Sequence, residues 1–215
     1  MEASEVVDLA FRVQGREVAA DHGYLLYAAI ARVAPAVHGD GAIGIHPLQG
    51  RLTGGRRLAL GRGSRLVVRV SAERIPELLP LVGQRLDVGG SVLTVGAPSV
   101  WALRPVAAVW SRLVVIKGFM EPGGFLDAAQ RQLTTLGVEG RATLMARTTA
   151  RTVEGRSATG AGDPIRRTLR IHEKEVVGFA LGVEQLTAEE SIRVQAAGLG
   201  GRRRFGCGVF IPAVR

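Results

Sequence analysis

The chain has 215 residues, which allows one large domain or two domains of about 100 residues each, and 47% of its residues are hydrophobic. It carries 28 Lys and Arg residues against 19 acids, a net charge of +9, and only Lys117 and Lys174 are lysines. No apolar run reaches the roughly 20 residues of a membrane helix. The single cysteine, Cys207, excludes an intrachain disulfide and a cysteine-based metal site.

The arginine excess has two explanations. Arginine offers a planar fork of donors that suits phosphate and stacks on bases, so a nucleic-acid partner is the first candidate. A GC-rich genome would also raise the content of Arg, Ala, Gly and Val, and charge alone does not decide between the two. The acidic N-terminal segment has no basic stretch before an apolar one, so we expect no signal peptide, a cytoplasmic location and no membrane partner.

The first half of the chain alternates strand-like and helix-like patterns. Val6–Gly15 starts with β-branched residues and then alternates, as a strand does. Tyr24 and Tyr27 lie at helical spacing, with Asp21 as the expected N-cap. The order strand, helix, strand, strand, helix, strand predicts a ferredoxin-like unit over residues 1–98. The later elements are a strand at 42–50, a hairpin at 56–71, a helix at 72–83 and a hairpin at 84–96 that turns at Gly89-Gly90.

The same order of elements repeats over residues 99–215. Thr187 and Glu190 form a capping-box pattern at the start of the last helix. A polar, glycine-rich stretch at 152–164 is expected to be a mobile loop. The sequence thus predicts an α+β fold of two tandem ferredoxin-like units with antiparallel sheets. The remaining elements are a strand at 111–119, a helix at 121–137, a strand at 138–151, a strand pair at 165–186, a helix at 187–198 and a strand at 207–212.

The segment "GLGGRRRFGCGVF" (residues 198–210) combines five glycines with three arginines. Loops that cradle nucleotide phosphates lie between a strand and a following helix. Here a helix precedes the loop and the last strand follows it, which disfavours a nucleotide site. A helix C-cap at Gly198 explains one or two glycines but not five. We therefore expect this loop to hold an extended phosphodiester backbone through Gly200, Gly201, Arg202, Arg203 and Arg204.

Tandem ferredoxin-like units with a basic glycine loop before the last strand resemble the RAMP superfamily of CRISPR systems. Within it, the chain resembles the CRISPR repeat-processing endoribonucleases, in the variant found in Myxococcus-type systems. The segments that carry the resemblance are 21–41, 43–50 and 198–210, supported by "VVIKGF" (114–119) and "FLDAAQRQL" (125–133).

The resemblance implies that the enzyme cuts precursor CRISPR RNA within each repeat to release guide RNAs. It implies a reaction without metal or cofactor, in which the RNA 2′-hydroxyl attacks the adjacent phosphate and leaves a 2′,3′-cyclic phosphate. The partners are then repeat RNA and, where the product is retained, other subunits of the crRNA-guided effector complex. Two alternatives stay open: a non-catalytic RNA-binding RAMP subunit of such a complex, and a ferredoxin-like enzyme acting on a small anionic metabolite.

Histidines are the candidates for proton transfer because the imidazole pKa lies near neutral pH. The resemblance places His38 at the position of the family's general acid or base, although it is also a plausible loop histidine. His46 is either a second catalytic residue or a structural one, and His22 is either catalytic or only the start of a helix. The resemblance adds Tyr24, at a spacing that is also typical of a core residue.

Basic residues outside the terminal loop are further RNA-binding candidates. Lys117, at the end of a strand, is either a phosphate contact or an ordinary surface lysine. Arg166, Arg167 and Arg170 flank a hairpin that is suited to gripping a repeat stem, while His172 at its tip is expected to be solvated. The sequence offers no carboxylate cluster for a metal, so we expect no metal and no cofactor.

Overall fold

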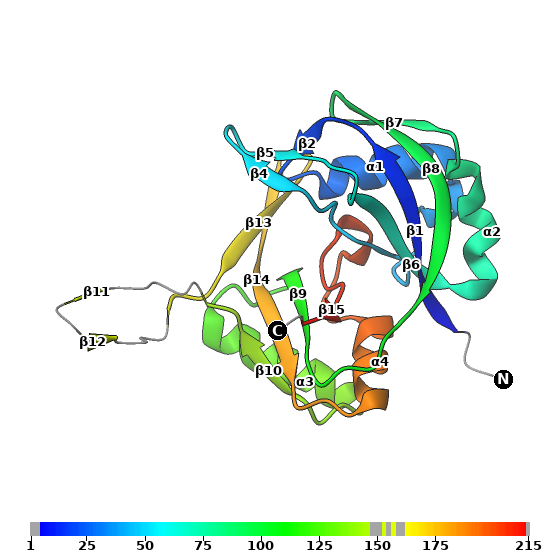
Figure 1. The fold of residues 1–215 in the computed structure, drawn as a ribbon. Coiled ribbons are helices and arrows are strands. Elements are labelled where there is room, and N and C mark those ends of the chain that lie inside the picture. Colours follow the sequence, from blue (N-terminus) through cyan, green and yellow to red (C-terminus); the bar gives the residue numbers. More distant parts are fainter. Residues whose placement is uncertain (1–4, 147–151, 154–155, 158–161, 214–215) are drawn as a thin grey trace.

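The computed structural model describes residues 5–146, 152–153, 156–157 and 162–213. These residues form two α+β units, each built on an antiparallel sheet, which lie one above the other in Figure 1. The predicted fold class, two tandem ferredoxin-like units, is confirmed by the strand orders given below. Within the described ranges, no helix combines the length and apolar character needed to cross a bilayer.

The first unit is a five-stranded sheet. Its elements are β1 (Val6–Gln14), α1 (Gly23–Val33), β3 (Gly44–Ile45), β6 (Arg65–Ser71), α2 (Ile75–Leu78), β7 (Arg85–Val88) and β8 (Ser91–Ala102). The strand order β3-β6-β1-β8-β7 places β1 between β6 and β8, with helices after β1 and β6, which is the ferredoxin-like arrangement. In β1, Leu9, Phe11 and Val13 are buried at every second position. Asp8 therefore faces the opposite side of the sheet.

The second unit repeats this order. Its elements are β9 (Val109–Val114), α3 (Pro122–Thr135), β10 (Arg141–Leu144), β13 (Arg166–Ile171), β14 (Lys174–Glu184), α4 (Ala188–Ala197) and β15 (Ile211–Pro212). The strand order is β10-β14-β9-β15, and β13 pairs with the first part of β14 to form a long hairpin. The predicted capping box is confirmed: the Glu190 amide donates to the Thr187 hydroxyl (3.2 Å), and the Thr187 amide donates to the Glu190 carboxylate (2.8 Å).

A small third sheet corrects one of the predictions. It contains β2 (Glu17–Ala19), β4 (Arg51–Thr53) and β5 (Arg57–Ala59), in the order β2-β5-β4. The hairpin predicted over residues 56–71 is wrong because β5 pairs with β2 and β4, whereas β6 pairs with β1 and β3. Strand β6 buries Leu66, Val68 and Val70 in the first unit's core, and that burial places it in the main sheet.

Other boundaries also differ from expectation. Strand β8 continues to Ala102, past the expected unit boundary at 98. The N-cap of α1 is His22 and not Asp21, because the Asp21 carboxylate accepts the Arg170 amide instead. Of the expected loop at 152–164, residues 154–155 and 158–161 lie outside the described residues, and the described part contains the short β11 (Thr152–Val153) and β12 (Arg156–Ser157). The remaining elements are the 3₁₀ turns η1 (Pro35–Val37), η2 (Ala72–Arg74), η3 (Leu79–Leu81) and η4 (Arg203–Phe205).

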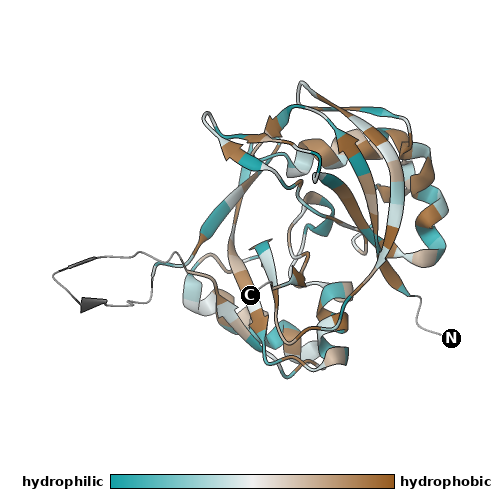
Figure 2. Cartoon of the chain, in the orientation of Figure 1, coloured by the Kyte–Doolittle hydropathy of each residue, from teal (hydrophilic) through white to brown (hydrophobic). Residues whose placement is uncertain are grey.

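The C-terminal segment packs into both units. Phe205 and Cys207 belong to the hydrophobic core of the first unit, whereas Phe210 belongs to that of the second. Leu169 of β13 also packs in the first core. Apolar residues accordingly run along the inner faces of both sheets and along the segment between them (Figure 2). The terminal loop and the β13–β14 hairpin are thus held against α1 by apolar burial.

Candidate active site

Helix α1 presents two tyrosines one turn apart. Tyr24 and Tyr27 lie at i and i+3, which places them on one face of the helix. Phe205 packs edge-on against both rings, with centroid distances of 5.7 Å to Tyr24 and 4.9 Å to Tyr27. Edge-on contacts of this kind contribute beyond simple burial, so they fix the terminal loop against the helix.

His38 lies in the loop just after α1 and η1, and its ring is exposed. Its Nδ1 atom is 3.0 Å from the Tyr27 hydroxyl, and the two rings stack at 6.3 Å. The Arg204 guanidinium lies over the same tyrosine ring, 5.4 Å from its centroid, and 5.1 Å from the centroid of Phe205. The imidazole of the first unit and an arginine of the terminal loop therefore contact one side chain, Tyr27.

The loop that carries His38 is anchored to the start of α2. Arg74 donates to the Asp40 carboxylate and to the Ala36 carbonyl (3.3 Å), while the Ala42 amide donates to Asp40 (2.7 Å). Burial tends to raise the pKa of Asp40, but these hydrogen bonds outweigh burial and lower it. At neutral pH the ionised Asp40 therefore ties the loop that follows His38 to Arg74.

The predicted candidate His22 lies inside the protein. Its Nδ1–H donates to the Ala19 carbonyl (2.8 Å), and its Nε2 accepts the Leu48 amide (2.9 Å). Burial lowers the pKa of His22, which keeps the imidazole neutral. Both ring nitrogens are thus occupied within the protein, and we assign His22 to the fold rather than to catalysis.

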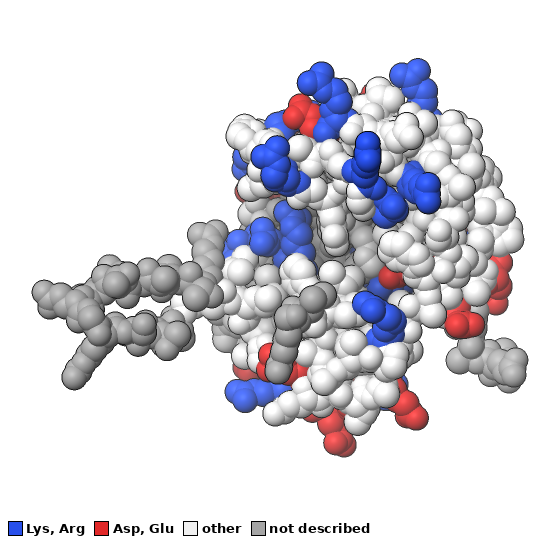
Figure 3. All heavy atoms as spheres, in the orientation of Figure 1, with Lys and Arg blue, Asp and Glu red and all other residues white. Residues whose placement is uncertain are grey.

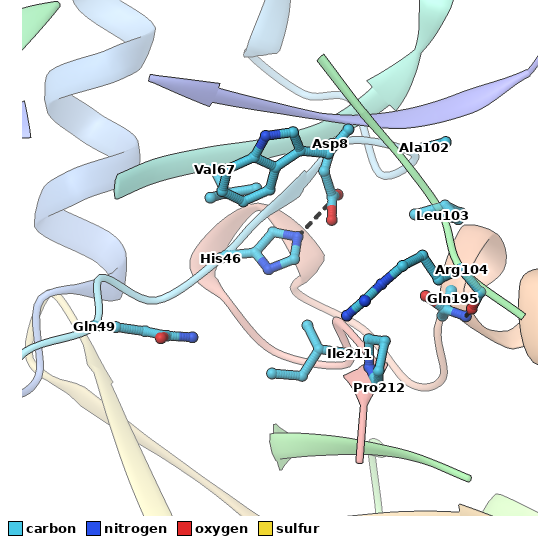
Figure 4. Close-up of a pocket in the computed structure, with 11 residues that line it drawn as sticks. Asp8, His46, Gln49, Val67, Ala102, Leu103, Arg104, Gln195, Ile211 and Pro212 are labelled. Atoms are coloured by element: carbon cyan, nitrogen blue, oxygen red, sulfur yellow. Dashed lines mark hydrogen bonds and ion pairs between the residues drawn. The ribbon is translucent and has the colours of Figure 1, made fainter. Parts of the chain in front are cut away.

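His46 lines a cleft of about 680 Å³ between the units, together with Trp101 and Arg104 (Figure 4). Its Nε2 is 3.1 Å from Asp8 Oδ1. Burial lowers the pKa of His46, and the nearby Asp8 only partly offsets that effect. Burial would raise the pKa of Asp8, but hydrogen bonds from His46 and Arg69 hold it well below its usual range. We name this set (Asp8, His46, Arg69, Trp101 and Arg104) the central cleft.

Arg69 is the residue that sequence reasoning missed. It is almost fully buried and forms a two-pronged pair with Asp8, with both N···O distances at 2.8 Å. Its Nη1 also donates to the carbonyl oxygens of Gln195 (2.8 Å) and Phe210 (2.6 Å). Arg69 thus joins the first sheet to α4 and the terminal segment. An arginine inside the apolar run "LVVRV" was the available sequence signal.

The three terminal arginines have different environments. Arg202 is exposed and adopts a left-handed backbone (φ 67°), and Arg204 stacks on the aromatic rings described above. Arg203 is buried, and its Nη2 donates to the Ala196 carbonyl (2.7 Å). Burial, reinforced by the positive charge of Arg69, lowers the pKa of Arg203 to about 10. Arg203 therefore secures the loop to the end of α4, which leaves Arg202 and Arg204 as the candidates for RNA contact.

The loop glycines allow close packing. The Gly200 amide donates to the Gln132 side chain (2.7 Å), and the Gly201 amide donates to the Val115 carbonyl (2.9 Å). A Cβ atom on Gly200, whose φ is 72°, would clash with the Val115 carbonyl oxygen. These glycines therefore seat the loop against the end of β9, and we do not assign their amides to RNA.

The β13–β14 hairpin reaches from the second unit to α1. Arg166 and Arg170 are exposed on it, and Arg167 is half-buried. At its tip, His172 is exposed but not merely solvated, because its Nε2 is 2.6 Å from the Tyr24 hydroxyl. Lys117 lies in the exposed turn that follows β9.

The residues around the two phenol rings of α1 form what we call the tyrosine cluster: Tyr24, Tyr27, His38, His172, Arg204 and Phe205.

Basic side chains dominate one face of the molecule. In Figure 3 they surround a central hollow and spread over the upper part of the molecule, whereas acidic side chains lie mainly along its lower and right-hand edges. Among the residues that the structure describes, no three His, Cys, Asp or Glu side chains lie close enough together to hold a metal ion. The charge distribution therefore favours a polyanionic partner.

The family model described as "Cas6 Crispr" matches residues 7–215. The chain belongs to this Cas6 family. It is 44% identical to a curated relative, the CRISPR-associated endonuclease Cas6 of Myxococcus xanthus (strain DK1622), over 97% of this chain and 82% of that relative. This likeness supports endoribonuclease activity and confirms the resemblance inferred from the sequence.

Solved structures agree with the family at the level of the fold. A Cas6-related protein from Pyrococcus furiosus has a TM-score of 0.66 at 12% identity and covers 95% of this chain and 97% of its own. A structure described as CRISPR associated protein Cas6 has a TM-score of 0.65 at 12% identity and covers 99% of this chain and 100% of its own. At such low identity these likenesses concern the fold alone.

Proposed function

We propose that this Cas6 family member cuts precursor CRISPR RNA within its repeats by metal-independent attack of the 2′-hydroxyl, with His38 as a general acid or base. The observation that carries the proposal is the contact of His38 and Arg204 with a single side chain, Tyr27. A proton-transfer group and a positive charge are both required next to the reacting phosphate. The tyrosine cluster supplies both.

The hydrogen bond to Tyr27 suits His38 to proton transfer. A phenol hydroxyl is both a donor and an acceptor, so it can serve the Nδ1 atom whether the imidazole is neutral or charged. Among the described residues, this is the one hydrogen bond that the His38 ring makes. The Nε2 atom is thereby available to take the 2′ proton or to protonate the leaving 5′-oxygen.

The surrounding arginines fit RNA binding. Arg202 and Arg204 lie on the terminal loop, and Arg166 and Arg170 lie on the β13–β14 hairpin that contacts the same helix. Guanidinium groups bind phosphate oxygens and stack on bases without needing a particular sequence. We assign these residues to the RNA backbone.

Cleavage of a matching repeat RNA in excess EDTA tests the proposal. We expect one cut per repeat and a 2′,3′-cyclic phosphate on the upstream product, identified by its mass. RNA with a single 2′-deoxy nucleotide at the cut site should bind with unchanged affinity and remain intact. Cleavage of the deoxy RNA would contradict the mechanism. Binding of the unmodified repeat without any cleavage would favour a non-catalytic RAMP subunit instead.

A further inference from the structure

A second histidine is hydrogen-bonded to a tyrosine beside the first. Tyr24 Oη is 2.6 Å from His172 Nε2, and the two ring centroids are 4.6 Å apart. His172 comes from the tip of the β13–β14 hairpin, so it belongs to the second unit, whereas His38 belongs to the first. The His172 ring is exposed. Its Nδ1 atom therefore lies at a surface that RNA can reach.

The two Tyr–His pairs share a common support. Both phenol rings pack edge-on against Phe205, and Arg204 lies over the ring of Tyr27. Because Tyr24 and Tyr27 are neighbours on one face of α1, they carry their histidines on the same surface of the helix. A phosphate bound by Arg204 would therefore lie on the surface that also carries both imidazoles.

The reaction needs two proton transfers in different places. The 2′-O–H bond breaks and its proton goes to a base as the 2′-O–P bond forms. The P–O5′ bond then breaks, and the 5′-oxygen takes a proton from an acid. A single imidazole provides only one of these transfers in the cleavage step. We propose that His172 is the second proton-transfer group, acting with His38, an inference that rests on the function proposed above.

The fold does not require His172 to hold the hairpin in place. The Arg170 amide donates to the Asp21 carboxylate (2.9 Å), and Leu169 is buried in the first unit's core. His172 itself adopts a left-handed backbone (φ 52°), which is uncommon outside glycine and carries a conformational cost at an exposed turn. The hairpin is therefore held in place without the His172 side chain, which leaves its imidazole available for chemistry.

Charged groups around both histidines are balanced. The pocket beside His172 is lined by Asp21 before α1, Arg56 of the β4–β5 turn, and Arg170 and Glu175 of the hairpin. Near His38, the charged groups are Arg204 and the network in which Arg74 pairs with both Asp40 and Glu77. Neither imidazole faces an excess of one sign, so bound RNA supplies the main additional charge at both.

Single-turnover cleavage of repeat RNA across pH tests the inference with His172→Asn, since asparagine tolerates a left-handed backbone. We expect a bell-shaped profile for the unchanged protein. In His172→Asn, one limb of the profile should disappear, the maximal rate should fall by about 10²-fold, and RNA affinity should persist. Glu173→Gln, on the same exposed turn, is the matched control and should leave both rate and profile unchanged.

An RNA whose bridging 5′-oxygen at the cut site is replaced by sulfur assigns the roles, because a thiolate leaves without taking a proton. One of the variants His38→Asn and His172→Asn should regain nearly the full rate on this RNA, and that histidine is the acid. If His172→Asn keeps both limbs, or if neither variant is rescued, the inference is overturned while the proposed cleavage stands. If the unchanged protein does not cut repeat RNA at all, the proposed function itself fails.

Discussion

The tyrosine cluster and the central cleft both contain histidine and arginine, but in opposite environments. In the cleft, Arg69 makes four hydrogen bonds within the protein, and His46 is fixed on Asp8. In the tyrosine cluster, His38 is exposed and bonded to one phenol, and Arg204 rests on aromatic faces. A side chain that is buried and hydrogen-bonded within the protein stabilises the fold, whereas an exposed side chain with a single partner can still bind substrate.

The largest expected effect is the loss of stability when the buried arginine of the central cleft is replaced. Arg69→Ala should lower the free energy of unfolding by about 3–5 kcal/mol, because Asp8 loses its two-pronged partner and keeps only His46, and two buried carbonyl oxygens lose their donor. Denaturant titration measures the change. Arg12→Ala, on the exposed side of the neighbouring strand, is the control and should stay within about 0.5 kcal/mol of the unchanged protein. A loss no larger than that of the control would contradict the structural role of Arg69.

The next largest effect distinguishes the buried Arg203 from the exposed Arg202. Arg203→Ala should destabilise the fold by about 1–3 kcal/mol, because the Ala196 carbonyl loses its buried donor. Arg202→Asn should leave stability nearly unchanged, weaken RNA binding and reduce the salt slope of binding by about one. Thermal melts and RNA titrations at several salt concentrations measure both. The reverse pattern would show that the two residues are wrongly assigned.

These arginines also show how much of the structure could be predicted from the sequence. The order of elements predicted the ferredoxin-like units because alternation and capping are local patterns, as at β1 and the capping box of α4. Residues 202–204 carry the same side chain, so nothing local distinguishes the buried member from the exposed ones. The contact of Tyr27 with Arg204 joins the first helix to the terminal loop, which are far apart in the chain. The packing of Phe205 against α1, a contact between distant parts of the chain, helps to bring them together.

The smallest expected effect concerns stability and pH. The pKa of His22 is lowered by burial in the folded state, so the unfolded chain binds more protons once the pH falls below about 6.5. The contribution of His22 to the free energy of unfolding should therefore be fully present above that pH and be lost progressively below it. His46, with a pKa lowered in the same direction, adds to the decrease. His22→Gln should show a shallower pH dependence in denaturant titrations, and an unchanged slope would contradict this account.

The most direct test of the central claim compares His38→Ala with His46→Ala in single-turnover cleavage of repeat RNA. The tyrosine cluster predicts that His38→Ala slows cleavage by about 10²-fold or more with RNA affinity nearly unchanged. His46→Ala should cut at a rate close to that of the unchanged protein, under conditions where it remains folded. Full activity in His38→Ala together with loss of activity in a folded His46→Ala would place the chemistry in the central cleft and contradict the account.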